Sequence, residues 1–262
     1  MLSFDEHKQN VTGIGFQKEG KWLYTSSEDG LVKIWDMRAR GAQQEYNAHS
    51  PVNTVTLHPN QREIIIGDQS GRVLVWDLMA NDCHRELVPE EGDMPAIRSV
   101  VMCPDGSKML AANNKGKVFM WDYDSSAYTP QKMIYAHDTY ILNMAVSPDG
   151  NLLATMSADH TTKIWKMDDF TIEKILTGHA RWVWDGAFSR DSKFILTVSS
   201  DLSARLWNIE QGVTKRTYTG HSKAVVCVAL NDDGNGTTSY QPAGATGSGT
   251  TQVPVPDAPP PQ

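Results

Sequence analysis

The sequence has few cysteines and no long apolar run. Its three cysteines, Cys83, Cys103 and Cys227, stand far apart and lack the spacing of a metal site. An odd number of scattered cysteines is typical of reduced core residues in an intracellular protein. The apolar runs are too short to span a bilayer, and residues 1–6 lack the basic and then apolar profile of a signal peptide. We therefore predict a cytoplasmic protein with no direct membrane insertion.

Basic residues are also scarce relative to acidic ones. The chain has 24 Lys and Arg against 31 Asp and Glu, which gives a net charge of -7. Nucleic-acid binding requires clustered basic side chains that neutralise phosphate, so we predict no nucleic-acid partner. Phosphate-binding glycine loops, HExxH and paired cysteine motifs are missing as well. The sequence therefore predicts no catalytic residue, cofactor or metal, and the carboxylate pairs at 90–91 and 168–169 are interpreted as solvated loop charges.

What the sequence does contain is a repeat. Tryptophans recur at spacings of 41, 45, 44 and 42 residues, each at the end of a short β-rich run: Trp35, Trp76, Trp121, Trp165 and Trp207. The five copies close as KIWD, LVWD, FMWD, KIWK and RLWN, and a small residue followed by His opens most of them. Short strands separated by turn residues, repeated at this period, predict an array of β-sheet units.

This pattern resembles the WD-repeat family over about residues 7–231. The resemblance implies an all-β fold, a β-propeller whose blades are sheets of four antiparallel strands. We expect five complete blades within residues 1–231 and unpaired strands at both ends. Residues 232–262, rich in Gly, Thr, Ser and Pro, are predicted to be a disordered tail. Its proline-rich end could dock in an aromatic groove.

The family's repeat carries a structural tetrad of His, Ser or Thr, Asp and Trp, in which hydrogen bonds satisfy a buried imidazole. Three copies contain it whole: His7, Ser27, Asp29 and Trp35; His137, Ser157, Asp159 and Trp165; and His179, Ser199, Asp201 and Trp207. Because the same set recurs, we interpret it as structural rather than catalytic. The second copy has Ser70 and the third Lys115 where the turn Asp would stand, so we expect those blades to depend more on packing.

The ends of the repeat array are incomplete. Residues 1–6 resemble the outer strand of a preceding blade, and residues 223–230, KAVVCVAL, read as an inner strand with nothing after it to complete a blade. Such ends would leave open sheet edges. We expect five blades of an ancestral seven, with two N-terminal blades missing. The alternatives are a five-bladed ring with loose ends and an open array completed by a partner.

Several segments resemble one branch of the family, the G-protein-beta-subunit-like (lethal-with-Sec-thirteen protein eight) subunits of the target of rapamycin (TOR) kinase complexes. They include LHPNQ at 57–61, GDQSG at 67–71 and RWVW at 181–184, none of which is general repeat consensus. This resemblance covers roughly residues 10–232. It implies a non-enzymatic subunit that binds and stabilises the TOR kinase domain, has other TOR complex subunits as partners, and meets membranes only through that complex.

The fifth copy departs from the repeat at two indoles. Its core positions are expected at Val183, Gly186 and Phe188, so Trp182 and Trp184 lie off the core pattern. The step of three from Val183 to Gly186 breaks strand alternation and predicts a bulge or a late strand start.

Exposed indoles suggest a partner interface. Tyr140 has the same offset from its His as Trp182, and Arg181 adjoins it, so we expect Trp182, Trp184, Tyr140 and Arg181 to form that interface. The competing interpretation is that one indole fills space left by Gly186.

A second binding role is left open by the end of the first repeat. Its last residues, 35–38, read Trp-Asp-Met-Arg. They fit the WDxR ending of propellers that serve as substrate receptors for cullin-four ubiquitin ligases. In such receptors the Arg reaches the ligase adaptor, so this alternative makes Arg38 the contact residue.

Overall fold

The computed structural model describes residues 3–89, 92, 94–124, 127–232, 237–240 and 251–254. The chain divides into two compact units, residues 1–141 and 142–262. All regular elements of the described residues are strands. No helix in these ranges is long and apolar enough to cross a membrane.

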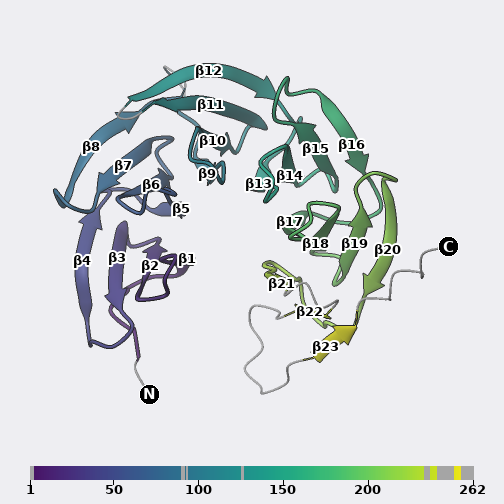
Figure 1. The fold of residues 1–262 in the computed structure, drawn as a ribbon, viewed down its shortest axis with the longest axis horizontal. Helices are drawn as coiled ribbons and strands as arrows, with labels where there is room; N and C mark the ends of the chain where they lie inside the picture. The colour runs from purple at the N-terminus through teal and green to yellow at the C-terminus, as the bar shows by residue number, and fades with distance from the viewer. Residues whose placement is uncertain are drawn as a thin grey trace. The chain divides into compact units, whose positions relative to one another are not determined.

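The first unit contains three antiparallel sheets of four strands, each in sequence order from the inner to the outer side of the unit in Figure 1. The first blade consists of β1 (Val11–Phe16), β2 (Trp22–Ser27), β3 (Leu31–Asp36) and β4 (Ala42–Asn47). The second consists of β5 (Val52–Leu57), β6 (Glu63–Asp68), β7 (Val73–Asp77) and β8 (Asp82–Leu87). The third consists of β9 (Ile97–Met102), β10 (Lys108–Asn113), β11 (Lys117–Asp124) and β12 (Ala127–Tyr135).

The second unit contains two further sheets of the same kind and a smaller one. The fourth blade consists of β13 (Ile141–Val146), β14 (Leu152–Ser157), β15 (Thr162–Lys166) and β16 (Ile172–Leu176). The fifth consists of β17 (Val183–Phe188), β18 (Phe194–Ser199), β19 (Ala204–Asn208) and β20 (Val213–Tyr218). The smaller sheet has three strands, β21 (Leu230–Asp232), β22 (Thr237–Tyr240) and β23 (Thr251–Pro254). The predicted all-β fold with five complete blades is confirmed.

Tight turns join the strands of each blade because the loops supply the required backbone geometry. Gly106 and Gly150 have φ angles of 76° and 76°, a left-handed conformation that glycine adopts without steric cost. The carboxylate of Asp105 accepts a hydrogen bond from the N–H of Ser107 at 2.9 Å, which fixes the same turn from its side chain. These turns reverse the chain and set the register of the antiparallel pair that follows.

Apolar side chains of adjacent blades within a unit form the cores. Ile64, Ile66 and Leu74 of the second blade pack with Tyr24 and Val32 of the first. In the second unit, Ala154 and Met156 of the fourth blade pack with Ile195 and Trp207 of the fifth. Each blade is therefore stabilised largely by burial against its neighbour, as expected for a repeat array.

The inner strands share an irregularity that the sequence predicts only for the fifth blade. The register of β17 against β18 shifts between Val183 and Asp185, so Trp184 is the extra residue of a bulge. The bulge prediction is therefore confirmed. The same shift occurs between Val11 and Gly13 in β1 and between Val52 and Thr54 in β5.

The two ends of the array differ in part from the sequence prediction. Residues 3–10 contain no strand, and residues 221–229 contain none before β21 begins at Leu230. The strand predicted for residues 223–230 is therefore almost entirely absent as hydrogen-bonded structure. Asp232, the first residue of the predicted disordered tail, ends β21, and two short strands, β22 and β23, lie within that tail. Its remaining residues lie outside the described residues.

Candidate functional site

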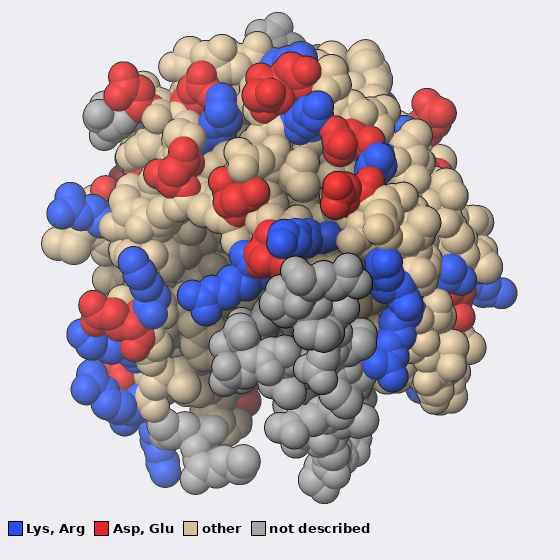
Figure 2. Space-filling model, turned by 45° about the vertical axis from the view of Figure 1, so that its right-hand side comes forward, with Lys and Arg blue, Asp and Glu red and all other residues tan. Residues whose placement is uncertain are grey.

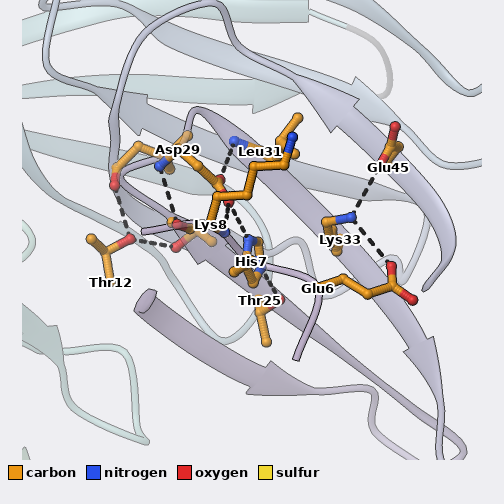
Figure 3. Close-up of polar contacts among 12 residues, drawn as sticks. Glu6, His7, Lys8, Thr12, Thr25, Asp29, Leu31, Lys33 and Glu45 are labelled. Atoms are coloured by element: carbon orange, nitrogen blue, oxygen red, sulfur yellow. Dashed lines mark hydrogen bonds and ion pairs between the residues drawn. The ribbon is translucent and has the colours of Figure 1, made fainter. Parts of the chain in front are cut away.

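The first and fifth blades contain a complete hydrogen-bonded tetrad. In the first, His7 Nδ1 lies 3.0 Å from Asp29 Oδ2 and His7 Nε2 lies 2.7 Å from Thr25 Oγ1. The indole of Trp35 donates to the same hydroxyl at 2.8 Å. Figure 3 shows His7, Thr25 and Asp29 converging from the N-terminal segment, β2 and the turn before β3. The arrangement satisfies every polar group that the blade buries at this point.

The fifth blade repeats this geometry. His179 lies 2.8 Å from Asp201 Oδ2 and 2.9 Å from Thr197 Oγ1, and Trp207 donates to Thr197 at 2.8 Å. Burial lowers the pKa of His179, despite the opposing effect of Asp201, so the ring is neutral at pH 7. Burial by itself would raise the pKa of Asp201, but hydrogen bonds from Ser203, His179 and the N–H of Ala180 outweigh it and lower the pKa to about 2.

The hydroxyl predicted for the tetrads was wrong. The prediction named Ser27, Ser157 and Ser199, but the tryptophans donate to the threonine two residues earlier in the strand: Thr25, Thr155 and Thr197. Each serine instead accepts the backbone N–H of the turn Asp, at 3.0 to 3.1 Å. Side chains two residues apart in a strand share a face, so the two positions are close to equivalent in a pattern. The second and third blades, which lack the turn Asp, have neither hydroxyl: Ile66 and Asp68 stand at the two positions in one, and Ala111 and Asn113 in the other.

In the fourth blade, Trp165 donates to Thr155 at 3.0 Å and Asp159 accepts the Thr161 hydroxyl at 2.6 Å. His137 is buried, and it belongs to the first unit while Asp159 and Trp165 belong to the second. Its predicted place in this tetrad therefore stays a prediction.

The second blade replaces the tetrad with a buried ion pair. Asp68 is fully buried and accepts hydrogen bonds from Arg72 Nε at 3.0 Å and Arg72 Nη2 at 2.7 Å. The Ser70 hydroxyl, which stands where the turn Asp was expected, donates to the same carboxylate at 2.8 Å. Ile66 takes the threonine position, and the buried Trp76 Nε1 has no hydrogen-bond partner. This blade therefore does not rest on packing alone.

In the third blade an amide side chain, Asn113, occupies the position that Asp68 has in the second blade. Asn113 ends β10 and accepts the N–H of Lys115 at 2.9 Å and of Lys117 at 3.1 Å. The turn that the Asp would organise is held by this side chain instead. The Nδ2 of Asn113 is buried without a hydrogen-bond partner.

Trp182 and Trp184 of the fifth blade form an aromatic pair at the start of β17. Their ring centroids lie 5.7 Å apart at an interplanar angle of 55°. Trp182 is 41% exposed, whereas Trp184 is half-buried and donates to Ser200 Oγ at 2.6 Å. Trp182, Arg181, His160 and Ser200 line a shallow depression of about 270 Å³. This surface, the indole surface, combines an exposed aromatic side chain with a cation.

Neither indole fills the space beside Gly186. A Cβ placed there would meet Met156 Sδ at 3.3 Å and Ile195 Cδ1 at 3.5 Å, so core side chains occupy that space. The cavity-filling interpretation of Trp182 and Trp184 is therefore wrong. Tyr140, the fourth predicted interface residue, is also exposed, and it belongs to the first unit. The bulge places Trp184 outside the core alternation, as the sequence predicts.

The described ranges contain no group of three or more His, Cys, Asp or Glu side chains that could hold a metal ion. The Arg38 side chain at the WDxR ending is exposed and pairs with Asp36 of its own motif at 3.3 Å. On the face drawn in Figure 2, acidic and basic side chains are interspersed.

Comparison with known proteins agrees with the blade pattern. The WD domain, G-beta repeat family matches residues 1–36, 41–77, 128–166, 170–208 and 212–240, more than half of the chain. The chain belongs to this WD-repeat family. The matches leave out most of the third blade, whose β10 lacks the threonine of the tetrad.

Individual relatives are also similar. The Schizosaccharomyces pombe protein named Target of rapamycin complex subunit wat1 is 50% identical over 175 residues, 65% of this chain and 55% of its own. A Dictyostelium discoideum protein, named Protein LST8 homolog, is 55% identical over 167 residues, 63% of this chain and 54% of its own. The Mus musculus protein named Target of rapamycin complex subunit LST8 is 42% identical over 180 residues, 66% of this chain and 54% of its own. The chain spans about half the length of these curated relatives.

Proposed function

We propose that this chain is a non-catalytic protein-binding subunit of target of rapamycin kinase complexes. The support comes from relatives at 42% to 55% identity whose names describe such subunits or the LST8 protein. The tetrads, which recur in the first and fifth blades, hold the strands of each sheet together. We therefore expect the partner-binding residues among the side chains outside the core pattern.

The observation that carries the proposal is the indole surface. An exposed Trp182 packed on an anchored Trp184 presents a large apolar area whose geometry is set before a partner arrives. Rigid aromatic side chains with a neighbouring Arg are the residues that most often dominate binding energy at protein interfaces. Arg181 is exposed beside them. We assign the contact with the kinase domain to Arg181, Trp182 and Trp184.

Tyr140 is proposed as a further contact of the same kind. It follows His137 by three residues, as Trp182 follows His179. It is exposed although tyrosine is an amphipathic side chain that proteins bury in part. Its substitution should weaken kinase recovery less than the loss of both indoles.

Affinity capture tests the proposal. The tagged full chain is expressed with the TOR kinase, and the kinase recovered is measured for the wild type, Trp182→Ala, Trp182→Ala with Trp184→Ala, and Met79→Ala. Met79 is an exposed apolar residue of the second blade and serves as the matched control. We expect the double variant to lose the kinase, the single variant to lose part of it, and the control to retain it.

Two outcomes would overturn parts of the proposal. Full kinase recovery by a soluble double variant would refute the indole surface as the interface. Capture of a cullin-four ligase adaptor without the kinase, lost in Arg38→Ala, would favour the ligase receptor role instead.

A further inference from the structure

Lys33 of the first blade lies between two carboxylates. Its Nζ lies 3.0 Å from Glu45 Oε2 and 3.4 Å from Glu6 Oε2, and its side chain is only 6% exposed (Figure 3). Glu45 stands opposite Lys33 in the register of β3 and β4, and Glu6 directly precedes the tetrad histidine. The two carboxylates therefore neutralise a cation that the blade largely buries.

The fifth blade has a cation at the same position but neither of these carboxylates. Arg205 stands two residues before the tetrad tryptophan, as the lysine does in the first blade. Gly178 directly precedes the tetrad histidine, where the first blade has Glu6. Thr217 lies opposite Arg205 in the register of β19 and β20, where the first blade has Glu45. Two uncharged residues therefore stand where this cation would find its partners.

The Arg205 guanidinium lies beside the first of these residues. A Cβ added to Gly178 would lie 2.9 Å from Arg205 Nη1, so the guanidinium is held close to the glycine backbone. The Nε of Arg205 is buried and has no hydrogen-bond partner among the described residues, whereas the side chain as a whole is half-buried. A buried donor of a charged group gains most from an anionic acceptor. The position is therefore suited to an anion.

Thr217 provides a point at which an anion can be attached covalently. Its side chain is exposed on β20, the edge strand of its sheet. A phosphate on the Thr217 hydroxyl carries its anionic oxygens as many bonds from Cβ as a glutamate carboxylate does. Lys215 and Arg216 directly precede Thr217, and basic residues before the acceptor are a charge pattern by which protein kinases select substrates.

We propose that Thr217 is a phosphorylation site whose phosphate pairs with Arg205. The Thr217 hydroxyl oxygen forms a bond to the γ-phosphorus of ATP, and the bond from that phosphorus to its bridging oxygen breaks. The hydroxyl proton passes to the catalytic base of the kinase, and ADP leaves. The phosphate then accepts charge-assisted hydrogen bonds from the guanidinium. It joins β20 to β19 by an ion pair, as Glu45 joins β4 to β3.

Charge substitution tests the geometry without a kinase. Thr217→Glu places a carboxylate at the position that Glu45 has in the first blade, and Thr217→Gln is its uncharged match. We expect a higher urea midpoint for the Glu variant than for the Gln variant, and no difference between them once Arg205→Met is added. Equal midpoints with Arg205 present would show that residue 217 does not face this cation, and would overturn the proposal.

Phosphoryl transfer is tested on the folded full chain with ATP, Mg²⁺ and a protein kinase that selects basic residues before its acceptor. Peptide mass spectrometry should place a phosphate on Thr217. Thr217→Val should remove that phosphate, whereas Thr219→Val, at an exposed position just after β20, should retain it. Absence of phosphate on Thr217, with or without phosphate on other residues, would overturn the proposal.

Phosphorus NMR of the phosphorylated chain measures the contact with Arg205. An exposed phosphothreonine has a second pKa of about 6. Because a neighbouring guanidinium favours the dianion, we expect the pKa of the Thr217 phosphate to be lower by about half a unit or more. Arg205→Met should return it to about 6. A phosphate pKa that Arg205→Met leaves unchanged would show that Arg205 does not hold the phosphate, and would overturn the proposal.

Discussion

Trp184 donates its indole N–H to the Ser200 hydroxyl at 2.6 Å, whereas Trp182, two residues earlier, leaves 41% of its surface exposed. The N–H of Ser200 in turn donates to the carbonyl oxygen of Trp182 at 3.0 Å. One residue therefore fixes both tryptophans, Trp182 through its backbone and Trp184 through its ring. The pair separates into an anchored indole and an exposed one.

Substitution of the anchored Trp184 should lower the free energy of unfolding more than substitution of the exposed Trp182. Trp184→Phe keeps the aromatic ring but leaves Ser200 without the indole donor, so we expect a loss of about 1 kcal/mol in the free energy of unfolding. Trp182→Phe should change it by less than about 0.5 kcal/mol, since exposed positions contribute little. Urea denaturation measures both, and equal losses would contradict the division of roles.

Thr197 of the fifth blade should contribute more to the free energy of unfolding than a surface threonine does. Thr197→Val removes the hydroxyl that joins His179 to Trp207 and leaves two buried polar atoms unsatisfied, at a cost of about 1–3 kcal/mol. Thr217→Val, at an exposed position of β20, is the control and should be close to neutral. Thermal unfolding followed by circular dichroism compares the two variants. Equal midpoints would show that the Thr197 hydroxyl is not a stabilising part of the tetrad.

The fifth blade should lose stability in two acidic ranges. The pKa of His179 is lowered in the fold, so below about pH 6.5 the unfolded chain binds the proton that the buried ring does not, and stability falls with pH. The pKa of Asp201 falls from 3.8 to about 2, so its contribution is complete above pH 3.8 and is lost as the pH falls toward 2.

Urea midpoints measured from pH 7.5 to pH 2 check both ranges. Asp201→Asn should lower stability at pH 7 and reduce the dependence between pH 3.8 and 2. His179→Gln should reduce the slope below pH 6.5, and the part that remains is expected from His58, whose pKa burial also lowers. A wild-type midpoint that does not change between pH 7.5 and 5 would contradict the neutral, buried state of His179.

The ion pair of the second blade makes a separate prediction. Arg72→Met leaves the fully buried Asp68 carboxylate with only its hydrogen bonds to Ser70 and the backbone, so we expect a loss of about 3–5 kcal/mol. Arg38→Met, which breaks an exposed pair with Asp36, should cost far less because solvent screens both charges. Chemical denaturation compares the two, and similar losses would show that burial does not set the strength of the Asp68 pair.

Much of the blade architecture follows from the sequence because it is local. Trp35 and its counterparts recur at one period, and turns such as the one at Gly106 limit where strands begin and end. The sequence also predicts the bulge at Trp184, because strand alternation fails between Val183 and Gly186. Thr197 was missed because Ser199 lies on the same strand face two residues later, and only the position of Trp207 distinguishes the two hydroxyls.

The repeat, the positions of most strands and the residues that depart from the repeat follow from the sequence, since each depends on neighbours within a few tens of residues. Tertiary structure alone decided that Trp184 is anchored while Trp182 is exposed, and that Arg72 replaces the tetrad around Asp68. It also decided that Ile14 lies uncovered while Val100 is buried. Equivalent positions of two inner strands differ in exposure because burial depends on which blade packs alongside, and that contact comes from residues far away in the chain.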